Sequence, residues 1–276
     1  MKRILVPTDF SSQAENALKV AAQLANRFDG EIFLLHMLEL PLQLVDPVVG
    51  SGNQNLPEAL FFMQLAKKKF KELIDAPYLE GIKIHDIVEF HQAFDGIMEI
   101  SKEHNCDFIV MGSNGSSGIK EVFIGSNTEK VVRNSTIPVL VIKNEHENFD
   151  INNFVFATDC DLEYKHTLNK AIQFANKINA NLHLVYINTA NNFKTTQETN
   201  QCLEDFVKGE DISAHSLNVY NDISVEKGVL NFAKSINAGL IGISTHGRKG
   251  LAHFFNGSIS EDLVNHANRP VVTFKI

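Results

Sequence analysis

The chain has 276 residues, of which 44% are hydrophobic and 21% are charged, and its formal net charge is −8 at pH 7. This length has room for two domains of ordinary size. The negative charge argues against an electrostatic grip on nucleic acid or on an anionic membrane. The one basic run, Lys67-Lys68-Lys69, falls in a helix-like stretch and is interpreted as a solvated face.

Targeting signals and cysteines were considered next. No apolar run approaches the roughly 20 residues that a membrane helix needs. The first apolar run ends at Pro7 and Asp9, which is too early for a signal peptide. Three widely spaced cysteines without a CxxC pair fit a reducing compartment. A cytoplasmic protein without a membrane segment is therefore expected.

Short apolar segments alternate with helix-like segments through the first half of the chain. Strands are predicted at 3–6, 32–36, 82–88, 108–111 and 138–142, and helices at 12–27, 57–75 and 95–104 and in the segment that opens at 126. Ser11 or Ser12 can cap the first helix, and Gly30 ends it. Because most of the strands are apolar throughout, they indicate a parallel sheet that is covered on both faces.

The fourth predicted strand breaks into a loop of glycine, serine and asparagine. Gly112 and Gly115 lie there, and Gly125-Ser126 opens a helical segment in which Ser126 and Glu129 match a capping box. A glycine-lined loop that faces a helix N-terminus offers backbone N–H groups and a positive dipole end to a phosphate. The alternative is a glycine-rich surface turn without a ligand.

The second half of the chain repeats the first. Thr8-Asp9 recurs as Thr158-Asp159, an offset of 150 residues that also relates Leu34 to Leu184. Farther on the offset is 132 residues, as the equivalent pairs Gly115 and Gly247, Gly125-Ser126 and Gly257-Ser258, and Pro138 and Pro270 show. We therefore predict two copies of one fold, at 1–145 and 150–276, joined by a polar linker and shortened by 18 residues in the second copy.

The spacing Gly112-x2-Gly115-x9-Gly125-Ser126 resembles the nucleotide-binding signature of the universal stress protein family, in its ATP-binding branch. The resemblance covers nearly the whole chain as a tandem pair. It implies an α/β fold with five parallel strands per copy, Rossmann-like and similar to the adenine-nucleotide α-hydrolase architecture. It also implies a pseudo-dimer, often through antiparallel contact of the last strands, here 138–142 and 270–276. A homodimer of whole chains is compatible with this pattern.

The same resemblance implies ATP, with or without magnesium, as the ligand. An aspartate at the position of Asp9 contacts the nucleoside, and a short carboxylate can accept hydrogen bonds from ribose or adenine. The alternative role for Asp9 is a helix cap. The backbone at Met37 would meet adenine, and Asn127 and Thr128 would reach the phosphates. The predicted nucleotide-binding residues are Thr8, Asp9, Met37, Gly112, Gly115, Gly125, Ser126, Asn127 and Thr128, with Asp159, Gly247, Gly257 and Ser258 in the second copy.

The second copy departs from the family pattern. Ser244 replaces the first glycine, and its Cβ can block the approach of phosphate. Arg248 and Lys249 add positive charge beside the loop, and Ser258 with Glu261 again matches a capping box. Nucleotide binding by the second copy stays open.

Enzymatic alternatives find little support in the sequence. The serines of the loop lie in no GxSxG motif, and Gly242-x4-Gly247 lacks the Lys-Ser/Thr pair of a P-loop. No HxH or HExxH spacing indicates a metal held by protein ligands alone. The favoured function is an ATP-binding, cytoplasmic stress-response protein that acts as sensor or regulator. An ATP-hydrolysing enzyme of related architecture would need a Ser-Gly-Gly-type loop where Pro7-Thr8-Asp9 stands, and a nucleotide-free interaction module is the third reading.

Overall fold

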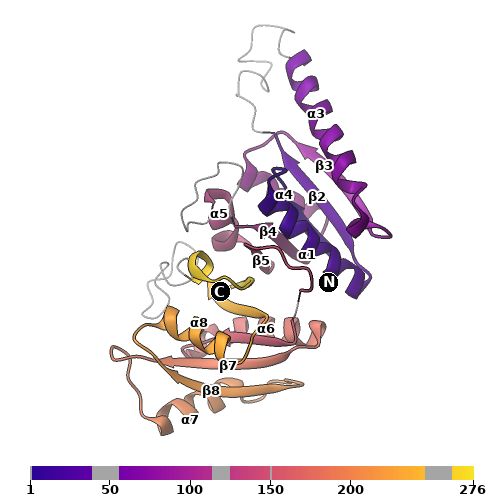
Figure 1. Cartoon of the computed structure of the whole chain (residues 1–276). Coiled ribbons are helices and arrows are strands. Elements are labelled where there is room, and N and C mark those ends of the chain that lie inside the picture. The colour runs from indigo at the N-terminus through magenta and orange to yellow at the C-terminus, as the bar shows by residue number, and fades with distance from the viewer. Residues whose placement is uncertain (1, 39–55, 114–124, 150, 246–262) are drawn as a thin grey trace.

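The computed structural model describes residues 2–38, 56–113, 125–149, 151–245 and 263–276 (Figure 1). The strands are β1 Arg3–Pro7, β2 Glu31–Met37, β3 Lys83–Glu89, β4 Phe108–Gly112, β5 Val139–Ile142, β6 Asn153–Ala157, β7 Asn181–Asn188, β8 His215–Asn221, β9 Leu240–Thr245 and β10 Val271–Lys275. The helices are α1 Ser12–Phe28, α3 Leu56–Ile74, α4 Ala93–Glu103, α5 Ser126–Asn134, α6 Lys165–Ile178, α7 Thr196–Val207 and α8 Val225–Ser235, with 3-10 turns at Pro77–Leu79 and Leu162–Tyr164. A last helical turn covers 263–266.

All of the strands belong to one sheet in the order β3-β2-β1-β4-β5-β10-β9-β6-β7-β8. Neighbours are parallel except β5 and β10, which pair antiparallel. The predicted α/β fold with two tandem copies is therefore confirmed, and so is the predicted contact of the last strands. In this arrangement neither β5 nor β10 is left as an open edge.

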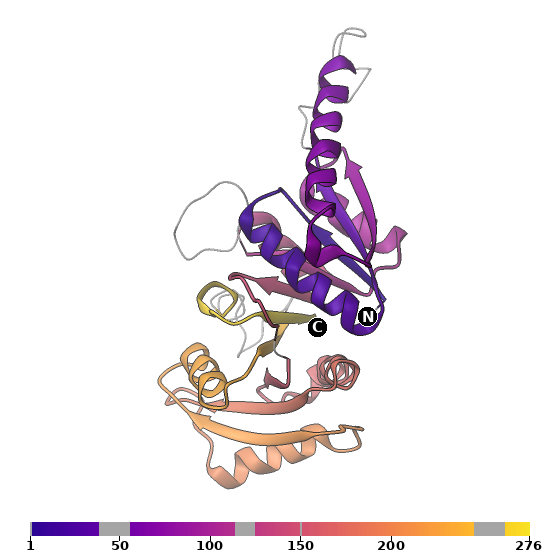
Figure 2. The same cartoon turned by 45° about the vertical axis from the view of Figure 1, so that its right-hand side comes forward.

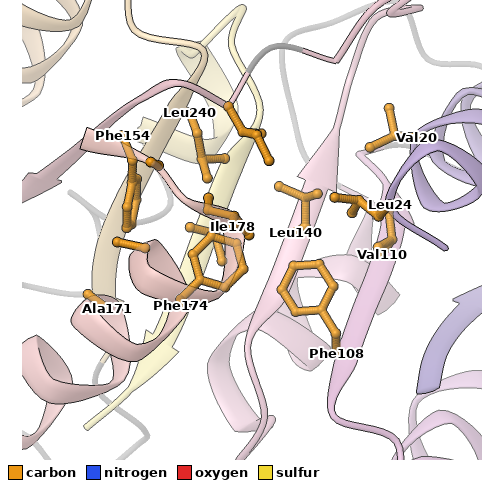
Figure 3. Packing of buried hydrophobic residues seen from close by; sticks show 14 of the residues in the cluster. Val20, Leu24, Phe108, Val110, Leu140, Phe154, Ala171, Phe174, Ile178 and Leu240 are labelled. Carbon is orange, nitrogen blue, oxygen red and sulfur yellow. The ribbon is translucent and has the colours of Figure 1, made fainter. Parts of the chain in front are cut away.

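Two apolar layers cover the two faces of the sheet. One layer contains α1, α3, α6 and α7, and the other contains α4, α5, α8 and residues 263–267. Successive residues of β1 alternate between the layers, since Ile4 and Val6 face the first and Leu5 faces the second. The first layer is continuous across the two copies: Phe108 of β4 stacks on Phe174 of α6 with ring centroids 5.5 Å apart (Figure 3).

The repeat is also visible in the backbone. Left-handed residues with φ near +50 to +60° recur at equivalent positions, namely Phe10 and Cys160, Asp29 and Asn179, and Asn105 and Asn237. The first two pairs are 150 residues apart and the third is 132 residues apart. The shortening lies between β7 and β8, where α7 has 12 residues against 19 in α3. Figure 2 shows the additional length of α3 projecting beyond the strand ends.

Two helix ends test the predicted caps. Ser11 is the N-cap of α1, where its side chain accepts a hydrogen bond from the Ala14 N–H. α5 begins at Ser126, but Gly125 occupies the N-cap position and no side-chain capping bond forms. The capping box predicted for Ser126 and Glu129 is therefore wrong, because Ser126 already lies inside the helix and Glu129 pairs with Arg133 instead.

A pseudo-two-fold relation joins the copies. Leu140 pairs with Val272 at the centre of the β5–β10 contact. On either side a lysine crosses to the other copy: Lys143 donates to the carbonyl oxygen of Asn265, and Lys275 donates to that of Arg133. Both lysines therefore satisfy carbonyl groups at the end of a helix in the opposite copy.

Within the described parts of the chain, no helix combines the length and the apolar character that crossing a membrane requires.

Candidate functional site

The strand order places the candidate site at the carboxyl ends of β1 and β4. The chain winds from β1 to β2 and β3 on one side, and then returns to β4 and β5 on the other. Ligands of open parallel sheets bind where the strand order reverses in this way. The second copy has the equivalent position between β6 and β9.

A tight turn follows β1. The Phe10 N–H donates to Thr8 Oγ1 at 3.0 Å, and the Ser11 N–H donates to Asp9 Oδ1 at 3.0 Å. Ser11 then caps α1, so the cap is Ser11 and not Asp9, which was the alternative role considered for this aspartate. Phe10 has φ of +62°, a left-handed conformation that few non-glycine residues adopt. The turn therefore holds the Asp9 carboxylate in a fixed place at the start of α1.

The Thr-Asp turn is built twice. In the second copy the Cys160 N–H donates to Thr158 Oγ1 at 3.0 Å, and the Asp161 N–H donates to Asp159 Oδ1 at 3.1 Å. Cys160 has φ of +63°. The threonine and aspartate of both copies thus have the same local role, which the 150-residue offset predicted.

His36 supports the first turn from β2. Its Nδ1 lies 2.8 Å from the Thr8 carbonyl oxygen, and its ring centroid lies 4.5 Å from that of Phe10. Burial lowers the pKa of His36 although the Thr8 hydrogen bond opposes this shift. A neutral imidazole that donates from Nδ1 fits the contact with a carbonyl oxygen.

Gly112 ends β4 against the first turn of α1. A Cβ at Gly112 would lie 2.8 Å from the Gln13 carbonyl oxygen and 3.1 Å from the Ala14 nitrogen. A glycine is thus required for the close approach of helix and strand, whether or not a phosphate binds. In the second copy Ser244 occupies this position, and its hydroxyl donates to Thr167 Oγ1 at 2.8 Å.

The second copy accommodates Ser244 by changing the helix. The segment equivalent to the first turn of α1 is the 3-10 turn Leu162–Tyr164, and α6 begins only at Lys165. The departure at Ser244 therefore coincides with a rebuilt helix N-terminus beside it.

The start of α5 is fastened to the end of β4. The Gly125 N–H donates to the Ser113 carbonyl oxygen at 2.6 Å, and Thr128 Oγ1 donates to the Gly112 carbonyl oxygen at 2.9 Å. Thr128 is buried, and its hydroxyl is used inside the protein. The first-turn N–H groups at Ser126 and Asn127 belong to the set that has no partner within a helix. This end of α5 therefore lies directly beside the last residue of β4.

Met37 ends β2, and its sulfur-bearing end packs against Gly96 in the first turn of α4. The structure thus brings Thr8, Asp9, Gly112, Gly125, Ser126, Asn127 and Thr128 to the ends of β1 and β4, with Met37 at the end of the neighbouring strand. Four predicted residues, Gly115, Gly247, Gly257 and Ser258, lie outside the described residues.

A cavity of about 390 Å³ adjoins the turn after β1. Thr8, Phe10, Ser11 and Glu15 line one side, and Lys69, Glu72, Leu73 and Ala76 line the side toward α3. Lys69 Nζ lies 5.0 Å from the Phe10 ring centroid. The sequence analysis missed this cavity, because its two walls come from helices more than 50 residues apart.

Among the described residues, no group of three or more His, Cys, Asp or Glu side chains has an arrangement that could hold a metal ion. The described part of the site offers a carboxylate, a helix N-terminus and backbone donors.

Two doubly wound α/β units, joined edge to edge and each with a Thr-Asp turn at its switch point, define the class of the protein. The chain belongs to the universal stress protein family, whose family model matches residues 1–143 and 218–275. It is 33% identical over 147 residues to universal stress protein MJ0531 of Methanocaldococcus jannaschii, a match that covers 51% of this chain and 82% of the relative. It is also 33% identical over 160 residues to universal stress protein MJ0577 of the same organism, covering 52% and 96%.

A solved structure matches the chain along its full length. The crystal structure of a universal stress protein from Archaeoglobus fulgidus covers 99% of this chain and 96% of its own, with a TM-score of 0.69 and 22% identity. At that identity the likeness shows the fold. The archaeal relatives from M. jannaschii each correspond to about half of this chain, whereas the A. fulgidus protein corresponds to both halves.

Proposed function

We propose that the first copy binds an adenine nucleotide, ATP in the first instance, at the carboxyl ends of β1 and β4. The chain is a stress-response protein of its family, and in this proposal nucleotide occupancy makes it a sensor or regulator in the cytoplasm. One observation carries the proposal. The rigid turn that presents Asp9 and the N-terminus of α5 meet at the switch point of the sheet, held there by Ser113 and Thr128.

Each part suits one part of the ligand. The Asp9 carboxylate can accept hydrogen bonds from ribose hydroxyls or adenine. The dipole and first-turn N–H groups of α5 favour a phosphate group. Magnesium would arrive with the triphosphate, held mainly by phosphate oxygens and water.

The proposal makes catalysis slow or absent. Efficient cleavage of ATP needs a group that activates water and a charge that stabilises the leaving phosphate. His36 is the imidazole nearest to the turn described here, and it is engaged with the Thr8 carbonyl oxygen. Phosphate release on the order of 1–10 per second would instead favour the enzyme alternative.

A different role is proposed for the second copy. Ser244 and the 3-10 turn at Leu162–Tyr164 change the region where a nucleotide would approach. We infer that this copy binds nucleotide more weakly than the first, or serves as an interaction module. We also retain the division into domains at 1–145 and 150–276, and a homodimer of chains, as proposals.

Calorimetric titration of the purified chain with ATP, ADP and AMP tests the proposal, together with mass spectrometry of any nucleotide that remains bound during purification. Gly115→Val is expected to abolish the tight site, and Gly247→Val serves as the matched control in the second copy. Unchanged ATP affinity in Gly115→Val would contradict the site in the first copy.

A further inference from the structure

The second copy contains two cysteines at positions where the first copy has a pair of aromatic rings. Phe10 of the turn after β1 contacts Phe70 of α3 edge to face, with ring centroids 5.3 Å apart. The offset of 150 residues converts Phe10 into Cys160, and the offset of 132 converts Phe70 into Cys202. The two offsets are those that relate the copies elsewhere, so the exchange of rings for thiols is a matched replacement.

The thiols of Cys160 and Cys202 interact directly, with Cys202 as a side-chain hydrogen-bond partner of Cys160. Cys160 belongs to the same apolar layer against which Cys202 packs. Cys160 is only 6% exposed, whereas Cys202 on α7 is partly exposed. A small oxidant can therefore reach Cys202 first.

A cation accompanies the pair. Lys194 Nζ lies 3.7 Å from Cys202 Sγ and 5.0 Å from the ring centroid of Tyr186. Tyr186 occupies the position equivalent to His36, 150 residues earlier. An ammonium group beside a sulfur stabilises the negative charge that develops when a thiol reacts as a nucleophile. Burial raises the pKa of the Cys160 thiol, so Cys160 is the less reactive member.

We propose that Cys160 and Cys202 form a redox-active thiol pair, which a hydroperoxide such as hydrogen peroxide oxidises to an intramolecular disulfide. The Cys202 sulfur, having released its proton, attacks a peroxide oxygen. The O–O bond breaks, Cys202 becomes a sulfenic acid, and the leaving oxygen takes the proton to form water. The Cys160 sulfur then attacks Cys202 Sγ, the S–O bond breaks, and a second water leaves with the Cys160 proton. Two thiols and one hydrogen peroxide thus give one disulfide and two waters.

The disulfide would tie the turn that contains Asp159 to α7. Cys160 has a left-handed backbone next to Asp159, so a covalent bond there restrains the turn of the second copy. The first copy cannot respond in this way, because Phe10 and Phe70 hold the same two elements together. Oxidation would therefore act on one copy alone.

The full-length protein is treated with hydrogen peroxide, its remaining thiols are alkylated, and a digest is analysed without reduction by mass spectrometry. The expected product has a mass about 2 Da lower, one peptide pair that links Cys160 to Cys202, and a Cys106 that is alkylated only after unfolding. Cys106 is buried in the other apolar layer and is the natural internal control. The link must reverse on addition of a dithiol.

Variants separate the pair from general oxidation. Cys202→Ser, on the partly exposed helix, should fold and give no linked peptide, and Cys106→Ala should form the link as the wild type does. Lys194→Met should slow the loss of the Cys202 thiol about tenfold, whereas Lys194→Arg should retain the rate. Oxidation of Cys202 to a sulfinic acid without any link to Cys160, or a link only between chains, would overturn the proposal. No nucleotide is used, so the result is independent of the proposed function.

Discussion

Gly112 and Gln13 are so close that a β-carbon on Gly112 would lie 2.8 Å from the Gln13 carbonyl oxygen. Real Cβ atoms do not approach a backbone oxygen to this distance, so the pair fixes how near α1 can come to β4. In the second copy Ser244 replaces the glycine, and the helix begins with a 3-10 turn. The relationship explains why a glycine at this position has a packing role in addition to any role in binding.

Gly112→Ser is expected to destabilise the protein by about 1–3 kcal/mol, because an added side chain in a packed region forces the backbone to shift. The free energy of unfolding in urea measures the change. Ser244→Gly is the matched control and should cost less, since it removes a hydroxyl and its hydrogen bond to Thr167 without a clash. Equal stability of Gly112→Ser and the wild type would show that helix and strand separate without cost.

The contact between the copies should depend on pH. Burial lowers the pKa of Lys143 to about 8, below its usual 10.5, although its ammonium donates to Asn265. Between these two pH values the unfolded chain binds more protons than the folded chain, so the free energy of unfolding should rise from pH 8 to pH 10.5. Below about pH 8 this contribution is constant.

Lys143→Met isolates that effect. Urea unfolding of the wild type and the variant at several pH values between 7 and 10.5 should give a difference in stability that changes with pH in this window. A difference that stays constant across the window would show that Lys143 has its ordinary pKa in the folded protein.

The linker between the copies is bound to α1. Gln23 Nε2 donates to the His146 carbonyl oxygen at 2.9 Å, and the Phe149 N–H donates to Gln23 Oε1 at 2.8 Å. Gln23→Ala leaves both backbone groups without this partner and should cost about 1–3 kcal/mol. Glu147→Ala, on the exposed side of the same segment, should change stability by less than about 0.5 kcal/mol. Equal effects of the two substitutions in urea would contradict the role of Gln23.

Much of the fold could be predicted from the sequence because apolar runs and turn residues are local signals. The strands and the first helix were placed within one or two residues, and the offsets of 150 and 132 residues predicted the duplicated Thr-Asp turn. The capping box of Ser126 could not be judged, since the same Ser-x-x-Glu pattern fits a serine one position inside the helix. Local sequence does not fix that register.

The candidate site was less accessible to such reasoning. The cavity beside Phe10 depends on α3, and the packing role of Gly112 depends on where α1 lies in three dimensions. The thiol pair was present in the sequence as the equivalents of Phe10 and Phe70. It became visible only when the structure showed that those two positions are in contact.

The central claim is that Asp9 and the N-terminus of α5 form an adenine-nucleotide site in the first copy. It is tested most directly by calorimetric titration of ATP into the wild type, Asp9→Ala and Asp159→Ala. We expect Asp9→Ala to weaken the tight site at least about tenfold, through loss of hydrogen bonds to a charged acceptor, and Asp159→Ala to leave that site unchanged. ATP binding that is equally strong in Asp9→Ala and in the wild type, or no binding by the wild type, would contradict the account.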